Sequence, residues 1–529
     1  MKQSKLQSNP IETSVLFVCA AVLSVVCRFA CFCCFLTKTV CSARSDATTS
    51  LCRLVDVQSK AEAMLSQNLC SRALCSARVA SAQLAALSRA LTTMKTSSLY
   101  IRGKEARNRR ALVLPHLEID KLVNDIPTIR RTLEARNIPL DISLLSTQLP
   151  SLRIVKNEFN RVQMAIMEIT RILSDHRLLS ASEKPESELK AELSTHYTTE
   201  REVKQSMYAK EEDVVPTILR IPNFIRAPTD NVSSLCKEYG NRPKFAFSPA
   251  SHVDIGGSDI VFRDHPRLCY LKADPALLEL SLIRYFDQKL SGLAGFEPVS
   301  SPDWVVDTVV EGCGKNPMDL DHTLVIESKE HNGGHQHHLV GSASFESFAA
   351  YMTRRQVRKL PACYYSLGRF YAAHCDALLP GLYSLAQSER ASVFAACKES
   401  ELENTFEELL VEVRQWYKEL KIPFRLRLVE PVQLRFIESL RVDIEVWSPA
   451  LDSYVLCGWF SLHGDFVSRR LIMVHGAGAS DIKFAHTLFG CVANIHCLAA
   501  SIMENGQTKD RCFSFPAVLN QRVRAQVSQ

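Results

Sequence analysis

The sequence predicts an α+β protein in which a long helical hairpin precedes a body of mixed strands and helices. Residues 117–214 are polar and carry apolar side chains at helical spacing. From about residue 218 to residue 529, short β-branched and aromatic runs alternate with amphipathic segments. The chain has neither a G-x-G-x-x-G nor a Walker-type glycine loop, so the two common parallel-sheet nucleotide-binding folds have no support.

Residues 1–104 read as a targeting region, because positive charge is concentrated there. This region holds 13 Lys and Arg against 4 Asp and Glu, whereas the other 425 residues hold 50 against 53. From Ala63 to Lys104 there is no acidic residue, and Ser, Ala and Leu surround six cations. That composition is typical of a mitochondrial presequence, and Met64 is a plausible start for it. We therefore expect a mitochondrial location, in the matrix; a disordered basic tail is the alternative.

An apolar stretch precedes that segment. Residues 15–36 contain a single charge, Arg28, and are long enough to span a bilayer. They predict either a membrane anchor or an upstream extension that the working protein lacks.

The hairpin is assigned to residues 115–215. Its first helix carries a heptad seam with spacings of 4, 3, 4, 3 and 4, formed by Val155, Phe159, Val162, Ile166, Ile169 and Leu173. A polar break at 178–188 follows, in which Pro185 ends any helix. A weaker stripe then runs through Leu189, Leu193, Val203 and Met207. Two helices of similar length with a short link predict an antiparallel coiled-coil arm.

The body is assigned to residues 218–529. Residues 424–429 (FRLRLV) and 442–447 (VDIEVW) have the composition of strands. Residues 399–420 predict a helix with one apolar face, made by Phe406, Leu409, Leu410, Val413, Tyr417 and Leu420.

Several strings in this order resemble the seryl-tRNA synthetase family of class II aminoacyl-tRNA synthetases, from about residue 115 to the end of the chain. They are IPN at 221–223, DN at 230–231, SHVDIG at 251–256, GFEPVSSP at 295–302, VDIEVWSPA at 442–450, HTLFG at 486–490 and IMENGQ at 502–507. The resemblance implies an antiparallel sheet flanked by helices, a tRNA-binding arm, and a dimer formed through the first signature motif. In this family the activity is ATP- and magnesium-dependent formation of seryl-adenylate and transfer of serine to tRNA.

The family's charged site residues do not appear where the resemblance places them. The serine-binding carboxylate falls on Ser344, and the Arg and Glu of the second motif fall on Ala372 and His374, although a three-residue slip would bring Arg369 nearby. The adenine-stacking Phe becomes Ser388, the metal-binding Glu becomes Leu456, and the phosphate-clamping Arg of the third motif becomes Cys497. Trp459 and Phe460 are expected to fill space meant for substrate. No catalytic residue, bound ATP or magnesium, or other metal site is therefore expected.

The resulting prediction is a non-catalytic mitochondrial paralogue of seryl-tRNA synthetase, similar to a non-catalytic group of that family in insect mitochondria. The alternatives are an active serine–tRNA ligase with a divergent site and a stand-alone nucleic-acid binder; the acidic body counts against the latter. The expected partner is a second copy or the mitochondrial seryl-tRNA synthetase. The dimer interface is placed at Leu280, Ile283, Gly295, Phe296 and Pro302, on an apolar helix face that also includes Leu290.

Two further clusters have alternative interpretations. Arg354, Arg355, Arg358 and Lys359 form either a solvated face or a contact for RNA or another anion. The string HNGGHQHH at 331–338 clusters four histidines, but its glycines favour a loop over a metal site. Weak, poorly specific RNA binding is expected overall.

Overall fold

The computed structural model describes residues 97–101, 112–181, 184–263, 267–327, 334–476 and 482–519. The chain divides into two compact units, 1–89 and 90–529, and all the described residues belong to the second. The apolar stretch 15–36 and most of the predicted targeting region lie outside the described residues. Among the helices of the described ranges, none is both long and apolar enough to cross a membrane.

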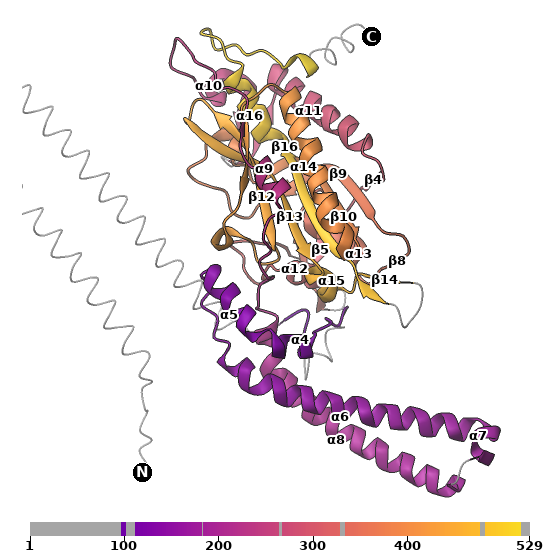
Figure 1. Ribbon diagram of the computed structural model, residues 1–529. Helices are drawn as coiled ribbons and strands as arrows, with labels where there is room; N and C mark the ends of the chain where they lie inside the picture. Colours follow the sequence, from indigo (N-terminus) through magenta and orange to yellow (C-terminus); the bar gives the residue numbers. More distant parts are fainter. Residues whose placement is uncertain are drawn as a thin grey trace, which may run out of the picture. The chain divides into compact units, whose positions relative to one another are not determined.

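Two long helices form the hairpin (Figure 1). They are α6 (Ser143–Ser174) and α8 (Glu186–Ile218), joined through α7 (His176–Ala181). The predicted seam faces the partner helix, since Val162 and Ile169 are buried on α6 and Leu189 and Met207 are buried on α8. Two short helices, α4 (Ile119–Asn124) and α5 (Ile126–Ala135), pack at the base of the hairpin in the same hydrophobic cluster.

The body is built on an eight-stranded sheet with the order β1-β11-β12-β13-β16-β10-β9-β4. Neighbouring strands are antiparallel except for β4, which pairs in parallel with β9 at one edge. The predicted α+β class with an antiparallel-rich sheet flanked by helices is confirmed. The strands are β1 (Glu238–Tyr239), β4 (Phe296–Pro298), β9 (Ala362–Tyr371), β10 (Gln387–Cys397), β11 (Phe424–Leu428), β12 (Leu440–Ser448), β13 (Ser453–Gly464) and β16 (His486–Asn494).

Helices cover the two faces of this sheet. On one face, which we call the helix face, α11 (Ala273–Ser291), α14 (Leu402–Glu419) and α16 (Ile495–Asn505) pack over the larger hydrophobic cluster. On the opposite face a smaller cluster is covered by α12 (Asp307–Gly312), α13 (Phe345–Met352) and α15 (Phe466–Leu471). Because side chains alternate along each strand, neighbouring residues of one strand belong to different clusters.

Shorter elements complete the body. They are α9 (Asp230–Leu235), α10 (His252–Gly256), the 3₁₀ turn η3 (Gly381–Tyr383), the hairpin β2 (Ile260–Phe262)–β3 (Cys269–Leu271), and two small sheets, one of β5 (Trp304–Val306), β7 (His337–Leu339) and β6 (Leu324–Ile326), the other of β15 (Lys483–Phe484), β14 (Val474–His475) and β8 (Gln356–Val357).

Residues 97–101, which the sequence places in the targeting region, are packed against the body. The side chain of Leu99 is 1% exposed and that of Ile101 is 7% exposed. Leu99 belongs to the same hydrophobic cluster as Val310 of α12 and Leu471 of α15. The folded body therefore begins upstream of the hairpin.

Candidate functional site

The position expected to carry a serine-binding carboxylate serves instead to start a helix. Ser344 is 1% exposed and is the N-cap of α13, where its hydroxyl accepts a hydrogen bond of 3.2 Å from the amide of Ser347. The Ser347 hydroxyl in turn donates to the carbonyl of Gly341 at 2.9 Å. Both hydroxyls are engaged in local structure, and neither supplies a charge.

The second group of predicted positions lies where β9 ends and β10 begins. Ala372 lines a cavity of about 470 Å³ together with Arg267, Tyr371 and Gln387. His374 is exposed, and its ring centre lies 6.4 Å from that of His322. Ser388 is 1% exposed, and its hydroxyl has no hydrogen-bond partner among the described residues. The cavity is lined mainly by small and apolar side chains.

Arg369, which a three-residue slip would bring into the second motif, is paired within the β9–β10 ladder. Its guanidinium forms an ion pair of 3.3 Å with Glu389, its partner across the β9–β10 ladder. Leu367, two residues earlier on the same side of β9, packs against the helix-face cluster. Arg369 therefore points toward the helix face.

Two other predicted positions are in direct contact. The Cys497 thiol, at the start of α16, donates to the carbonyl of Leu456 at 3.5 Å. A hydrogen bond with Cys457 and burial together raise the pKa of Cys497 well above its usual value, so this thiol is neutral at physiological pH. The Leu456 side chain is 38% exposed. A neutral thiol and an aliphatic side chain offer no electrostatic attraction for phosphate or a divalent cation.

A tryptophan surrounded by arginines lies on the sheet face opposite the helix face. Trp459 is 7% exposed, and the guanidinium carbons of Arg435, Arg390 and Arg441 lie 4.3, 5.2 and 5.4 Å from the centre of its ring. Arg390 also stacks on Phe370 at 3.4 Å. These contacts, which sequence reasoning did not anticipate, are cation–π interactions that fill this part of the face with the chain's own side chains.

Phe460 does not share that location. It is fully buried on the helix face, where it approaches Gly490 so closely that a Cβ at that glycine would come within 2.2 Å of its ring. The expectation that both aromatics fill one space is therefore wrong, because consecutive strand residues point to opposite faces and the two side chains belong to different clusters.

Some ionisable groups on this face are paired or neutral, whereas Arg390 and Arg435 keep their charges beside Trp459, and the Nε of Arg390 has no hydrogen-bond partner among the described residues. Arg441 donates to Asp443 at 2.6 Å, and the buried Glu346 forms an ion pair of 2.6 Å with Lys315. Burial alone would raise the pKa of Glu346, but the charge of Lys315 keeps it lowered. Burial, with the nearby Arg435 charge, lowers the pKa of His463 to about 3, so this imidazole is neutral.

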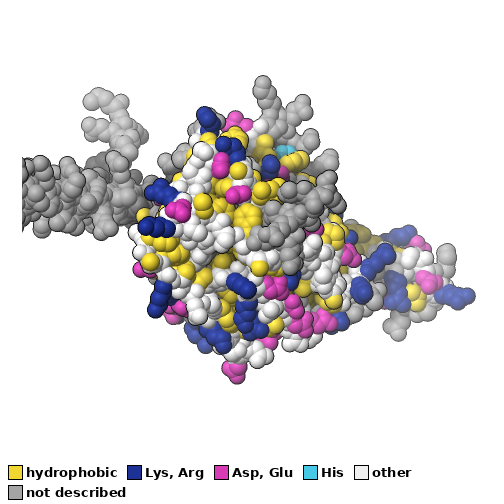
Figure 2. Space-filling view, turned by 90° about the horizontal axis from the view of Figure 1, so that it is seen from above, with side chains coloured by type: hydrophobic (Ala, Val, Ile, Leu, Met, Phe, Trp, Pro, Cys, Tyr) yellow, Lys and Arg dark blue, Asp and Glu magenta, His cyan; other side chains and the backbone are white. Residues whose placement is uncertain are grey.

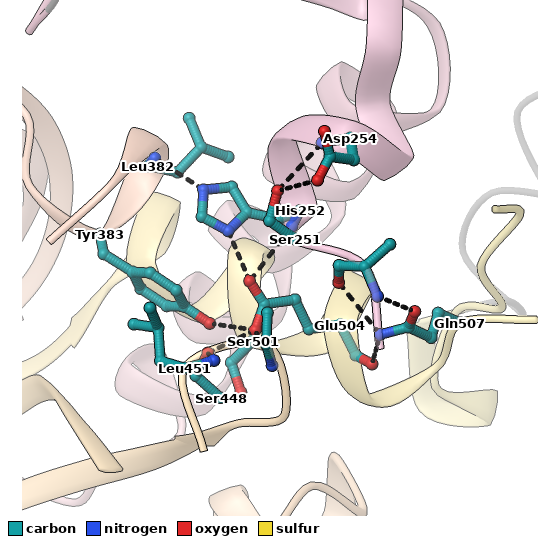
Figure 3. Close-up of polar contacts among 12 residues, drawn as sticks. Ser251, His252, Asp254, Leu382, Tyr383, Ser448, Leu451, Ser501, Glu504 and Gln507 are labelled. Atoms are coloured by element: carbon teal, nitrogen blue, oxygen red, sulfur yellow. Dashed lines mark hydrogen bonds and ion pairs between the residues drawn. The ribbon is translucent and has the colours of Figure 1, made fainter. Parts of the chain in front are cut away.

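A second buried network was missed by sequence reasoning, although three of its members lie in strings quoted for the resemblance. Glu504 of α16 accepts from His252 Nδ1 at 2.7 Å, from the Tyr383 hydroxyl at 3.0 Å and from the Ser448 hydroxyl at 2.5 Å (Figure 3). His252 Nε2 accepts from the amide of Leu382 at 3.0 Å, which fixes the tautomer with the proton on Nδ1. The network ties α10, η3, β12 and α16 together, and its groups are satisfied and buried, as in a structural core.

The predicted interface residues are only partly on the surface. Leu280 on α11 is 55% exposed, whereas Ile283 is half-buried against the core. Leu290 is fully buried, so its inclusion in an exposed apolar face is wrong: ten residues after Leu280, it faces the sheet. Figure 2 shows hydrophobic side chains lying between charged groups on the face of the molecule seen from above.

The remaining interface residues lie at the sheet edge. Gly295 has a φ of +79° in the turn before β4, a conformation that favours glycine. Phe296 then pairs with Cys363 of β9, and Pro302 is exposed beyond the strand.

The cationic cluster is exposed, whereas the described histidines of the string at 331–338 are partly or fully buried. Arg354, Arg355, Arg358 and Lys359 are all exposed around β8. Of the histidines, His331 lies outside the described residues, His335 pairs with Asp307 at 2.9 Å, and His338 is buried. Within the described ranges, no three His, Cys, Asp or Glu side chains are grouped to hold a metal ion.

Comparisons with known proteins agree with the resemblance found in the sequence. No protein-family model matches the chain. The chain is 28% identical to the serine–tRNA synthetase-like protein Slimp of Drosophila melanogaster over 447 residues, covering 80% of this chain and 93% of that protein. It is 24% identical to the mitochondrial serine–tRNA ligase of Mus musculus, covering 77% of this chain and 82% of the ligase.

Solved structures show the same fold. A seryl-tRNA synthetase from Pyrococcus horikoshii complexed with ATP matches with a TM-score of 0.61 and 19% identity, covering 77% of this chain and 97% of that one. A cytoplasmic serine–tRNA ligase from Naegleria fowleri in complex with AMP matches equally well, with a TM-score of 0.61, 17% identity and the same coverage.

Proposed function

Because the chain resembles seryl-tRNA synthetases in sequence and has their class II fold, we propose that it is a non-catalytic paralogue of that family, acting in mitochondria as a binding or stabilising subunit. The partner is a synthetase chain or a second copy, and RNA binding is weak. The mitochondrial assignment is supported by the acid-free basic segment and by the mitochondrial relative.

One observation carries the proposal: the positions that need charge are occupied by neutral side chains with structural contacts. Ser344 caps a helix, Cys497 bonds to the Leu456 carbonyl, and Trp459 is packed among arginines. A single preorganised charge contributes about 10²–10³ in rate, so the loss of several leaves little stabilisation of a transition state. ATP, magnesium and serine therefore have no fitting set of side chains at these positions.

The competing proposal is an active serine–tRNA ligase with a divergent site. Serine-dependent ATP–pyrophosphate exchange separates the two, because it reports adenylate formation without tRNA. We expect no exchange above a blank without serine, with an active seryl-tRNA synthetase as positive control. The variant Cys497→Arg should also remain inactive, since one restored charge does not rebuild the others. Serine-dependent exchange by the unmodified protein would show adenylate formation and overturn the non-catalytic proposal.

A further inference from the structure

Residues 97–101, which precede the hairpin in the sequence, form a short segment that we call the strap. It holds the buried carboxylate of Glu311. The Ser97 hydroxyl donates to Glu311 Oε1 at 2.6 Å, and the amides of Ser98 and Leu99 donate to Oε2 at 2.5 and 3.1 Å. The same Ser97 hydroxyl accepts from the amides of Leu99 and Tyr100 at 3.2 and 3.0 Å. The strap therefore has a defined local turn as well as a defined partner on α12.

The strap also closes part of the core. Ser98, Leu99 and Ile101 are 5%, 1% and 7% exposed. Leu99 belongs to the cluster beneath α12, α13 and α15. If the strap were absent, apolar surface in this cluster would meet water and the Glu311 carboxylate would lose three hydrogen-bond donors.

Glu311 depends on these donors more than a surface carboxylate would. Burial raises its pKa, while the strap's hydrogen bonds and the charge of Arg470 oppose that shift. Arg470 is itself buried, with its pKa lowered by burial to about 9. Removal of the strap would leave this pair of buried charged groups less well satisfied.

We propose that the targeting segment is removed by a cut upstream of Ser97, so that the strap stays in the mature protein as part of the body. This rests on the mitochondrial location proposed above. The step is a hydrolysis: water adds across one peptide bond, leaving a carboxylate on the released segment and an α-ammonium on the mature chain. The basic, acid-free segment 63–104 thus has two roles, with residues 97–101 serving the fold.

The first test imports the full-length chain into isolated mitochondria and determines the N-terminus of the processed product. We expect a shortened chain whose first residue is Ser97 or lies upstream of it. An imported chain that keeps its original N-terminus, or one that begins after Ser97, would overturn the proposal. A mature chain that begins after Ile101 would overturn the strap while leaving the mitochondrial location intact. A chain that is not imported would instead contradict the location.

The second test examines the strap independently of import. In the full chain, Leu99→Asp should lower the melting temperature by several degrees, and Leu99→Ala by less. Leu114→Asp is the matched control, because Leu114 is 68% exposed, and should leave the melting temperature unchanged. Equal melting of the Leu99 variants and the unmodified chain would overturn the proposal.

Discussion

His496 is a buried histidine on α16 that contacts Glu279 on α11. Its Nε2 lies 3.2 Å from a carboxylate oxygen of Glu279, and its Nδ1 accepts from the amide of Glu389 at 3.2 Å. Burial alone would lower its pKa, but hydrogen bonds with Cys269 and Glu279 raise the pKa of His496 to about 9. The raised pKa favours the imidazolium at neutral pH. In that state Nδ1 is protonated and gives up the hydrogen bond from the Glu389 amide, which belongs to the neutral ring, while the attraction to Glu279 stabilises the fold.

The sign of the pH dependence follows from this shift. Because the folded-state pKa exceeds the unfolded value of about 6.5, the contribution is fully present below that value and is lost as the pH rises through about 9. We expect the stability difference between the unmodified protein and His496→Gln to shrink by up to about 3 kcal/mol between about pH 6 and pH 9.5. Denaturant unfolding of both proteins at the two pH values measures this difference in the free energy of unfolding. His374→Gln, at an exposed position, is the control, and a pH-independent difference would contradict the assignment.

At the scale of elements, the two helices of the hairpin differ in charge. Helix α6 carries four cations, Arg153, Lys156, Arg161 and Arg171, against two glutamates, whereas α8 carries four cations against eight acidic residues. A phosphate backbone is attracted to the first helix and repelled by the second. RNA that binds this hairpin should therefore lie along α6 and bind weakly.

A binding titration with tRNA tests this charge asymmetry. We expect affinity to fall at least about tenfold between 50 and 200 mM salt, with little preference among tRNAs. The double reversal Arg161→Glu and Arg171→Glu should weaken binding further. The same reversal on α8, Lys190→Glu and Lys204→Glu, is the control and should have less effect. Tight, tRNA-specific binding that survives physiological salt would contradict this prediction.

At the scale of the whole molecule, the edge of the sheet formed by β4 lies beside a helix with an exposed apolar side chain. β4 is the last strand in the sheet order, and Leu280 of the neighbouring α11 is 55% exposed. An apolar helix surface beside a sheet edge suits an interface between subunits. This supports the proposed dimer, whether with a second copy or with the mitochondrial synthetase.

Leu280→Asp tests this interface without disturbing the core. We expect the variant to weaken association at least about tenfold, which corresponds to about 1.4 kcal/mol. Size measurement at micromolar concentration and pull-down with tagged mitochondrial seryl-tRNA synthetase report the two kinds of dimer. Leu378→Asp, at a side chain that is 87% exposed, should have no effect. An unmodified protein that is monomeric and recovers no synthetase would contradict the proposal.

Much of the architecture could be predicted because it depends on local periodicity. The seam through Val162 and Ile169 predicted helix α6, since a spacing of three and four places side chains on one helix face. The order of the short strings predicted the similarity to seryl-tRNA synthetases and the antiparallel sheet. The residue types at Ser344 and Leu456 by themselves determined that these positions carry no charge, whereas the neutrality of the Cys497 thiol also depends on its burial.

Contacts between side chains that are distant in the sequence could be seen only in the folded structure. Whether Trp459 or Phe460 faces the arginines depends on strand register, and whether Leu280 or Leu290 is exposed depends on how α11 lies against the sheet. His252 and Glu504 are far apart in the chain, as are Ser97 and Glu311, and only folding brings each pair into hydrogen-bonding distance. The sequence by itself determined the elements and the missing charges, because these depend on residue type and local spacing. The buried networks required the fold, because a hydrogen bond depends on distance in space, and distance along the chain does not determine it.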